Sequence, residues 1–204
     1  GRSPVGVFLR RFAPFQGAIE DSAEGERRSG HVNEPTVDWL PITMETYEVT
    51  QVLLTVGTVY HVRKPRTEET LFTVRGELMS TTAKFHLVEG DAGKARADLT
   101  ANFIKTKYEI RPSEGGAIMG ALVFPAVAFK KTLTLTVGDV EYEADGGVFK
   151  GVFQCKTKGG AVVLEIAKEL SIRDTFLVKT DESLPLEVSL LSAVAIHSRF
   201  YEMI

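Results

Sequence analysis

Basic residues form clusters at several points of the sequence, and these clusters are its main candidates for binding an anionic group. The clusters are Arg63, Lys64 and Arg66; Lys105 with Lys107; Lys130 with Lys131; and Lys156 with Lys158. Bases that neighbouring strands bring together can hold a phosphorylated group by charge-assisted hydrogen bonds. Lysines on exposed strand edges also prevent pairing between sheets, so a structural role explains the same residues equally well. We take the first seven of these bases as candidate ligands of an anionic group.

The sequence contains no pattern that indicates catalysis or metal binding. The histidines are spaced without the regularity of a ligand set: His31, His61, His86 and His197. Three acids, Asp174, Asp181 and Glu182, are too few for a calcium-binding loop, and favourable charge at the start of a following helix explains them. Neither the phosphate-loop pattern G-x-x-x-x-G-K-[ST] nor G-x-S-x-G occurs. We predict no enzymatic activity, no metal and no cofactor.

His197 is the histidine with the most specific setting, because it lies near the end of an apolar helical segment. A histidine there can hydrogen-bond to the carbonyl groups of the last helical turn. We expect that arrangement, with the ring reaching the open end of a barrel, rather than a ligand or catalytic role. His61 and His86 lie in the middle of predicted strands, where we expect them to face solvent.

The composition is that of one globular domain. Of the 204 residues 44% are apolar and 25% are charged, and the net charge of −3 argues against a general nucleic-acid binder. The single cysteine, Cys155, excludes an intramolecular disulfide framework, suits a reducing compartment and reads as a half-buried strand residue. No apolar run reaches the roughly 18 to 20 residues of a membrane span, and the first residues lack a signal-peptide core. We expect a cytoplasmic protein without a transmembrane span, and peripheral membrane attachment stays open.

From about Ile42 the sequence alternates between apolar and polar residues in short runs, which is the pattern of β-strands. Turn segments rich in Gly and Asp, such as GDAG at 90–93 and SEGG at 113–116, separate these runs. The spacing predicts eleven or twelve strands in a sandwich or a barrel. A repeated unit, IKTKYEIR at 104–111 and IRDTFLVK at 172–179, places an aromatic and an aliphatic residue on the same strand face.

The segment SLPLEVSLLSAVAIHSRFY at 183–201 differs from the rest, because its apolar residues lie on most sides of a helix. Such a helix must be buried on most sides. A closed sheet of about twelve strands is too wide to fill its interior with its own side chains, and a helix about 10 to 12 Å across fits that space. We therefore predict a closed barrel of about twelve strands around a central C-terminal helix at about 184–202.

Residues 1–40 are predicted to form an extension, and residues 41–204 to form the barrel. Residues 16–38 have the composition of a linker. The preceding segment VGVFLRRFAPF is interpreted as a strand packed on the domain, with a membrane-touching amphipathic segment as the alternative.

Several stretches together resemble a known family: TVYHV, LFTVRGELMSTTAKFHLVEGDAGKARADLT, KYEI, AVVLEIAKELSIRDTFLV and the final helix. From about Tyr47 to Tyr201 the chain resembles the LURP-one-related proteins of the tubby C-terminal-like superfamily, which also includes the phospholipid scramblases. The chain departs from those relatives at AIHSR (195–199), where they usually carry an aspartate late in the closing helix. The resemblance implies a twelve-stranded barrel around the helix.

The resemblance also implies a function, namely that of a non-enzymatic binding or scaffolding module for anionic membrane lipids or a protein partner. Tubby binds phosphatidylinositol bisphosphate through basic residues of its barrel wall, but those positions cannot be aligned with this chain, so none is transferred. One alternative is a carrier of an apolar molecule, which would lie beside the small residues Ser189, Ser192, Ala193 and Ala195. A scramblase-like lipid protein is a third possibility. The partner and the oligomeric state are not predicted.

Overall fold

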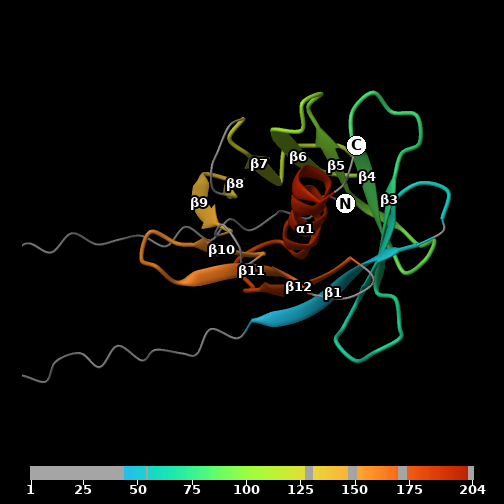
Figure 1. The fold of residues 1–204 in the computed structure, drawn as a ribbon, viewed down its shortest axis with the longest axis horizontal. Coiled ribbons are helices and arrows are strands. Elements are labelled where there is room, and N and C mark those ends of the chain that lie inside the picture. Colours follow the sequence, from blue (N-terminus) through green and yellow to red (C-terminus); the bar gives the residue numbers. More distant parts are fainter. Residues whose placement is uncertain (1–43, 54, 127–130, 147–150, 170–173, 202–204) are drawn as a thin grey trace, which may run out of the picture. The chain divides into compact units, whose positions relative to one another are not determined.

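The computed structural model describes residues 44–53, 55–126, 131–146, 151–169 and 174–201, all of which belong to the unit Pro41–Ile204. The predictions for the extension at 1–40, including its linker and its amphipathic segment, lie outside the described residues. The strands are β1 (Glu45–Val52), β2 (Val59–Arg63), β3 (Phe72–Gly76), β4 (Lys84–Glu89), β5 (Ala95–Ala101), β6 (Lys107–Pro112), β7 (Gly120–Val123), β8 (Thr132–Val137), β9 (Val140–Asp145), β10 (Val152–Lys156), β11 (Val162–Lys168) and β12 (Thr175–Thr180). The only helix in these parts is α1 (Leu186–Phe200), and Figure 1 shows the arrangement.

The strands form one closed antiparallel barrel in which each strand pairs with its neighbours in the sequence. Closure occurs between the first and the last strand: Val49 of β1 lies opposite Val62 of β2 on one side and Phe176 of β12 on the other. The predicted closed barrel of about twelve strands is therefore confirmed. Closure leaves no sheet edge open, so edge protection is not needed to explain the strand lysines.

Every second residue of a strand faces the interior of the barrel, and these residues are mostly apolar. In the repeated unit, Tyr108 with Ile110 and Phe176 with Val178 are buried, and the bases that follow them, Arg111 and Lys179, are exposed. The same pattern holds for β2, where Tyr60 and Val62 are both fully buried. The repeat thus supplies inward-facing side chains from strands on different sides of the barrel.

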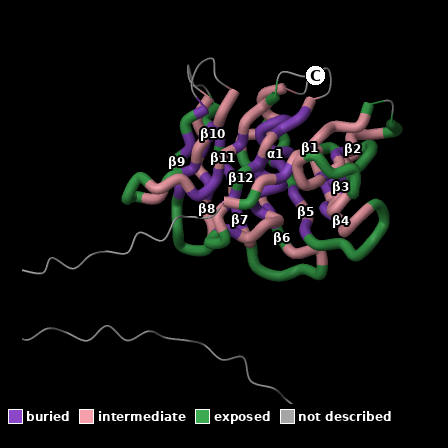
Figure 2. The backbone as a smooth tube through the Cα atoms, turned by 90° about the horizontal axis from the view of Figure 1, so that it is seen from below, coloured by how far each residue is buried: buried purple, intermediate pink, exposed green. Residues whose placement is uncertain are grey.

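The helix fills this interior. Strands surround α1 in Figure 1, and every residue from Val188 to Ser198 is buried. Figure 2 shows the same contrast, with buried positions along the helix and exposed positions at the strand connections. Pro185 is the residue before the first helical turn, and its carbonyl accepts a hydrogen bond from the Ser189 backbone at 3.2 Å. The predicted central helix is confirmed, within two residues of its expected start and end.

The small helix residues are packed, and their polar atoms have partners. The Ser189 hydroxyl lies 2.7 Å from that of Thr180, and the Ser192 hydroxyl donates to the Val188 carbonyl at 2.7 Å. Ala193 and Ala195 are fully buried. Two pockets of the described residues, one of about 830 Å³ and one of about 340 Å³, have no residue of α1 in their lining. The alternative of an apolar ligand beside the helix gains no support.

The meander gives the barrel two distinct ends. Odd-numbered strands run toward one end and even-numbered strands run back from it. Because α1 follows β12, it starts at the other end and its C-terminus reaches the first one. We call this first end the mouth; its connections are 53–58, 77–83, 102–106, 124–131, 146–151 and 169–174, some of which lie partly outside the described residues.

Candidate functional site

The structure divides the predicted basic residues between the two ends of the barrel. Arg63 ends β2 at the end opposite the mouth, and Lys64 and Arg66 follow it in the connection to β3. Lys105, Lys107 and Lys131 lie at the mouth, at the start of β6 and β8 or just before them. Lys130 lies outside the described residues. The candidates therefore cannot form one site, and the two groups must be judged separately.

The group opposite the mouth is occupied by local contacts. The Lys64 ammonium lies 3.0 Å from a Glu45 carboxylate oxygen and 3.9 Å from the centre of the Tyr47 ring. Burial alone would lower the pKa of Lys64, but hydrogen bonds with Glu45 and Tyr47 outweigh it and raise that pKa. The Arg63 guanidinium contacts the His61 ring at 3.2 Å. These contacts join β1, β2 and the start of the connection to β3, so this group has a structural role in local contacts.

Lys107 at the mouth is also neutralised. Its ammonium lies 2.9 Å from Glu109, and the same carboxylate group accepts a hydrogen bond from Arg111 at 2.9 Å. Hydrogen bonds from these two bases, Lys107 first, hold the pKa of Glu109 below its usual value. Lys107 therefore belongs to an ion-pair row on the outside of β6 and is not positioned as a ligand.

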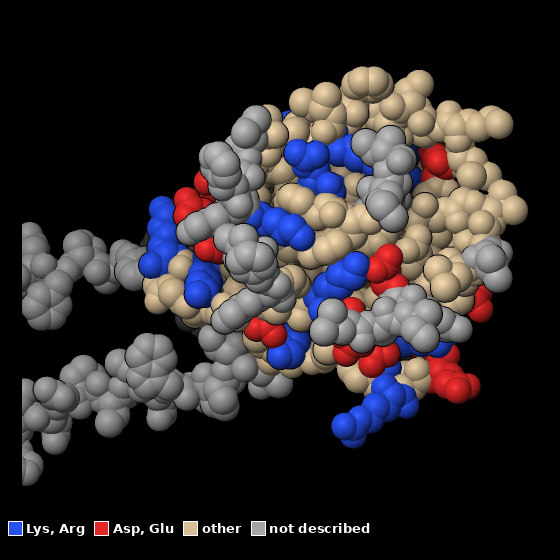
Figure 3. Space-filling model, viewed as in Figure 1, with Lys and Arg blue, Asp and Glu red and all other residues tan. Residues whose placement is uncertain are grey.

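Bases surround the C-terminal end of α1 at the mouth. The Lys105 ammonium donates to the Ser198 carbonyl at 3.5 Å, and the Lys131 ammonium lies 4.3 Å from the centre of the Tyr201 ring. The Lys168 ammonium lies 4.2 Å from the centre of the same Tyr201 ring. Arg199 is in the last turn of α1. Figure 3, which looks onto the mouth, shows Lys and Arg side chains around the middle of this face. The negative end of the helix dipole favours cations at such a position.

Lys168 and Lys131 differ in their partners. The Lys168 ammonium lies 2.6 Å from an Asp174 carboxylate oxygen. Lys131 has aromatic contacts but no ion pair to a described residue, and the Nε of Arg199 is buried without a hydrogen-bond partner there. We define Lys105, Lys131, Lys168 and Arg199 as the mouth cations. Lys168 and Arg199 were not predicted as candidates, because only the fold shows that the end of β11 and the end of α1 coincide.

His197 is buried, and the prediction that its ring bonds to the carbonyl groups of the last helical turn is wrong. Its ring is 2% exposed and lies 2.7 Å (Nδ1) from the Tyr60 hydroxyl and 3.2 Å (Nε2) from an Asp174 carboxylate oxygen. A carboxylate can only accept, so Nε2–H donates to Asp174, and Nδ1 shares a hydrogen bond with the Tyr60 hydroxyl. The ring therefore connects the helix to β2 and to the residue before β12.

Asp174 holds this network at the surface. Burial alone would raise the pKa of its carboxyl, but hydrogen bonds from Lys168 and His197 outweigh it and hold the pKa below its ordinary value. The proposed helix-start role is therefore wrong for Asp174, which lies at the C-terminal end of α1. Asp181 lies at the far end of β12 and accepts from the Ser183 backbone at 2.9 Å. These acids are separated by the length of a strand and cannot bind one calcium ion together.

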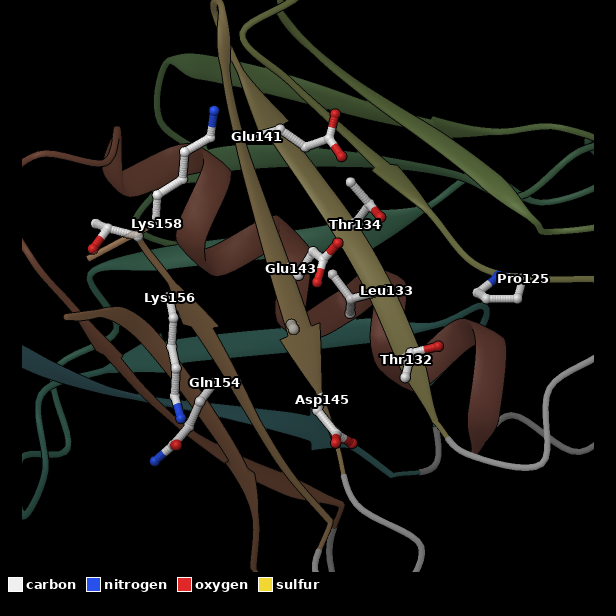
Figure 4. Close-up of a pocket in the computed structure, with 12 residues that line it drawn as sticks. Pro125, Thr132, Leu133, Thr134, Glu141, Glu143, Asp145, Gln154, Lys156 and Lys158 are labelled. Carbon is white, nitrogen blue, oxygen red and sulfur yellow. The ribbon is translucent and has the colours of Figure 1, made fainter. Parts of the chain in front are cut away.

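The larger pocket, of about 830 Å³, lies on the outer side of β8, β9 and β10 (Figure 4). Glu141, Glu143 and Asp145 project from alternate positions of β9, while Lys156 and Lys158 come from β10 and the turn after it. Because charges of both signs line the same space, it lacks the single-signed field that would attract an anionic group. In the described parts of the chain no three His, Cys, Asp or Glu side chains are grouped as metal ligands.

Cys155 and the two strand histidines complete the predicted set. Cys155 is 3% exposed, so it is fully rather than half buried, and burial raises the pKa of its thiol to about 12. His61 and His86 do lie on the outer, partly exposed face of the barrel. His86 contacts two carboxylates, Asp98 at 2.8 Å and Glu77 at 2.9 Å.

No protein-family model matches this chain, and no curated protein matches it. Within the described residues no helix has the length and apolar character that crossing a bilayer requires.

Proposed function

We propose that this chain is a non-enzymatic binding module, tubby-like in architecture, whose mouth cations engage the phosphorylated headgroups of anionic phospholipids. The observation that carries the proposal is the concentration of cations around the end of α1, where aromatic rings rather than an ion pair to a described residue hold the Lys131 ammonium. The sequence resemblance to the tubby-like superfamily and the barrel with its central helix support the same function. A protein partner with a phosphorylated or acidic surface is the competing occupant.

Lys131 is the base best placed to contact a headgroup. Its ammonium is held near two aromatic rings, at 4.3 Å from the centre of Tyr201 and 5.5 Å from that of Phe200. Aromatic faces attract a cation without neutralising it. The charge of Lys131 is therefore positioned and still available to a phosphate, whereas Lys168 already shares its charge with Asp174.

Vesicle co-sedimentation tests the proposal. We expect the chain to pellet with phosphatidylcholine vesicles that contain phosphatidylserine or a phosphoinositide, and to pellet far less with phosphatidylcholine alone. Lys131→Glu should weaken anionic binding by roughly tenfold or more, since it reverses a charge near the surface. Lys158→Glu, in the exposed turn at the opposite end, changes the net charge equally and serves as the matched control.

Equal binding of the two variants would contradict headgroup recognition at the mouth. Equal, negligible pelleting with neutral and anionic vesicles would remove the membrane function altogether. A soluble inositol phosphate that competes with the vesicles would indicate the headgroup rather than the bilayer charge as the ligand.

A further inference from the structure

Large apolar side chains are exposed mainly at the mouth. Of the nine that are strongly exposed in the described residues, six belong to three mouth connections: Leu53, Val56, Leu78, Met79, Phe103 and Ile104. Three of them are almost fully exposed, with Met79 at 104%, Val56 at 87% and Phe103 at 81% of the reference area. Scattered single apolar residues are common on protein surfaces, but a group at one end is a signal of interaction. We call these six residues the apolar rim.

The apolar rim is continuous. Its three connections are neighbours, because β2 pairs with β3 and β4 pairs with β5. A Cβ added at Gly57 would lie 3.0 Å from the Leu78 side chain, so the first two connections touch. Leu78, Met79 and Phe103 line the same pocket of about 340 Å³, which joins the second connection to the third.

The backbone holds these side chains outward. Met79 adopts φ = 61° and Lys105 adopts φ = 53°, a left-handed backbone conformation that residues other than glycine rarely adopt. The Asn102 side-chain oxygen accepts hydrogen bonds from the backbone of Thr106 at 2.8 Å and of Lys107 at 3.0 Å. Phe103 and Ile104 are thus presented at the tip of a turn that is hydrogen-bonded at its base.

Charge around the apolar rim favours a membrane as its occupant. The described residues of its three connections carry two charged side chains, Glu77 and Lys105. The Glu77 carboxylate is paired with His86 at 2.9 Å and with Lys84 at 3.5 Å. Figure 3 shows this as a nearly uncharged area at the upper right, beside the Lys and Arg side chains in the middle of the face.

An apolar edge beside a group of cations matches the boundary between acyl chains and anionic headgroups. We propose that the apolar rim inserts into this boundary of an anionic bilayer, while the mouth cations contact the headgroups. This inference rests on the proposed function and adds to it an orientation, with the barrel standing mouth-down on the membrane, and an apolar anchor. Protruding side chains on three separate loop tips suit a deformable lipid surface, since a protein partner would need a matching pocket for each tip.

Two pairs of substitutions compare the ends of the barrel. Phe103→Ser with Ile104→Ser removes exposed apolar area at the mouth, and Ile118→Ser with Val140→Ser removes exposed apolar area at the other end. All four side chains are exposed, so thermal unfolding should change little. We expect the first pair to lower partitioning onto phosphatidylcholine–phosphatidylserine vesicles by roughly tenfold or more, and the second pair to have no effect.

A fluorescent label reports insertion directly. Cys155 is buried, so a cysteine introduced as Met79→Cys can be labelled selectively with an environment-sensitive dye, and Val140→Cys provides the control. We expect a blue shift and higher emission from the label at 79 on vesicle binding, and no change from the label at 140. Residual binding of the unlabelled chain at about 0.5 M salt is also expected, because apolar contacts are not screened as charges are.

The outcomes separate the two proposals. If the chain pellets with anionic vesicles but neither label responds and the Phe103/Ile104 variant binds normally, insertion is refuted and headgroup binding stands. If that variant loses binding while Lys131→Glu does not, the anchor stands and headgroup recognition fails. Failure of the unaltered chain to bind any vesicle refutes both, and conversion of a dimer to a monomer by the Phe103/Ile104 variant without a change in vesicle binding identifies a second copy as the occupant instead.

Discussion

At Gly120 the barrel wall comes close to the helix, and replacing this residue tests whether the helix fills the barrel as described. A Cβ at Gly120 would lie 3.0 and 3.1 Å from the two methyl groups of Val188. Carbon atoms in contact normally stand about 3.5 to 4.0 Å apart. Val188 is fully buried in α1, where a valine has essentially one χ1 rotamer, so it cannot turn away. Gly120→Ala therefore overpacks this contact.

The expected loss follows from two opposing effects. Overpacking of a well-packed core costs about 1 to 3 kcal/mol. The alanine also restricts the unfolded chain, which offsets about 0.4 to 1 kcal/mol of that loss. We expect Gly120→Ala to lower the free energy of unfolding by about 1 to 2 kcal/mol, which for a domain of this size corresponds to a fall in Tm of about 2 to 8 °C.

Urea unfolding followed by circular dichroism provides the measurement. Gly159→Ala is the matched control, because its nearest neighbour would be the Thr157 hydroxyl at an ordinary 3.7 Å, and its effect should stay within about 0.5 kcal/mol. Val188→Ala makes room for the new methyl, so the double variant should be more stable than the sum of its single changes by at least about 0.5 kcal/mol. Equal stability of the two glycine variants, together with strictly additive effects at Gly120 and Val188, would refute the packing of the helix against β7.

Tyr60→Phe should lower the free energy of unfolding by about 1 to 3 kcal/mol, because it removes the hydroxyl that is hydrogen-bonded to the buried His197 ring. Chemical denaturation measures this loss, and a loss below about 0.3 kcal/mol would contradict the hydrogen bond. For His86, burial alone would lower the pKa, but hydrogen bonds with Asp98 and Glu77 outweigh it and raise that pKa above the unfolded value. The protonated ring therefore contributes stability in full below about pH 6.5, and this contribution is lost as the pH rises through the folded-state pKa, so the urea midpoint should fall over that interval in the unaltered chain but not in His86→Gln. Because burial raises the pKa of Cys155 to about 12, iodoacetamide at about pH 8 should label it only after denaturation, and stoichiometric labelling of the native chain would show that the thiol is accessible.

The fold could be predicted because its determinants are local and redundant. Each strand shows period-two alternation bounded by turn residues, and the same arrangement of an aromatic two residues before an aliphatic recurs in β2, β6 and β12. The segment around Leu190 is apolar on most helical sides, which requires a surrounding wall. A helix that must be enclosed and a sheet too wide to fill its own interior are both satisfied when the sheet closes around the helix.

The candidate site could be predicted only in part, because it depends on contacts between residues far apart in the sequence. Lys131 was identified from its pairing with Lys130, but nothing in the sequence indicates that Lys168 and Arg199 lie at the same end. His197 was assigned to helix carbonyls, the nearest acceptors along the chain, whereas its actual partners are 137 and 23 residues away. The exposure of Met79 and Phe103 could not be predicted from the sequence either, because an apolar residue in a short connection can be buried or exposed to solvent.

The order of elements along the chain has a consequence for biosynthesis. β1 completes the barrel by pairing with β12, and α1, which fills the interior, follows all twelve strands. During translation the twelve strands leave the ribosome before α1 does. The inward-facing aromatic rings of the nascent strands therefore lack the helix as a packing partner until α1 emerges. Contacts of such long sequence separation form slowly and leave apolar surface exposed in the meantime. Folding of this barrel should therefore be completed only after the helix has left the exit tunnel, and until then the nascent chain should depend on chaperones that cover its inner face.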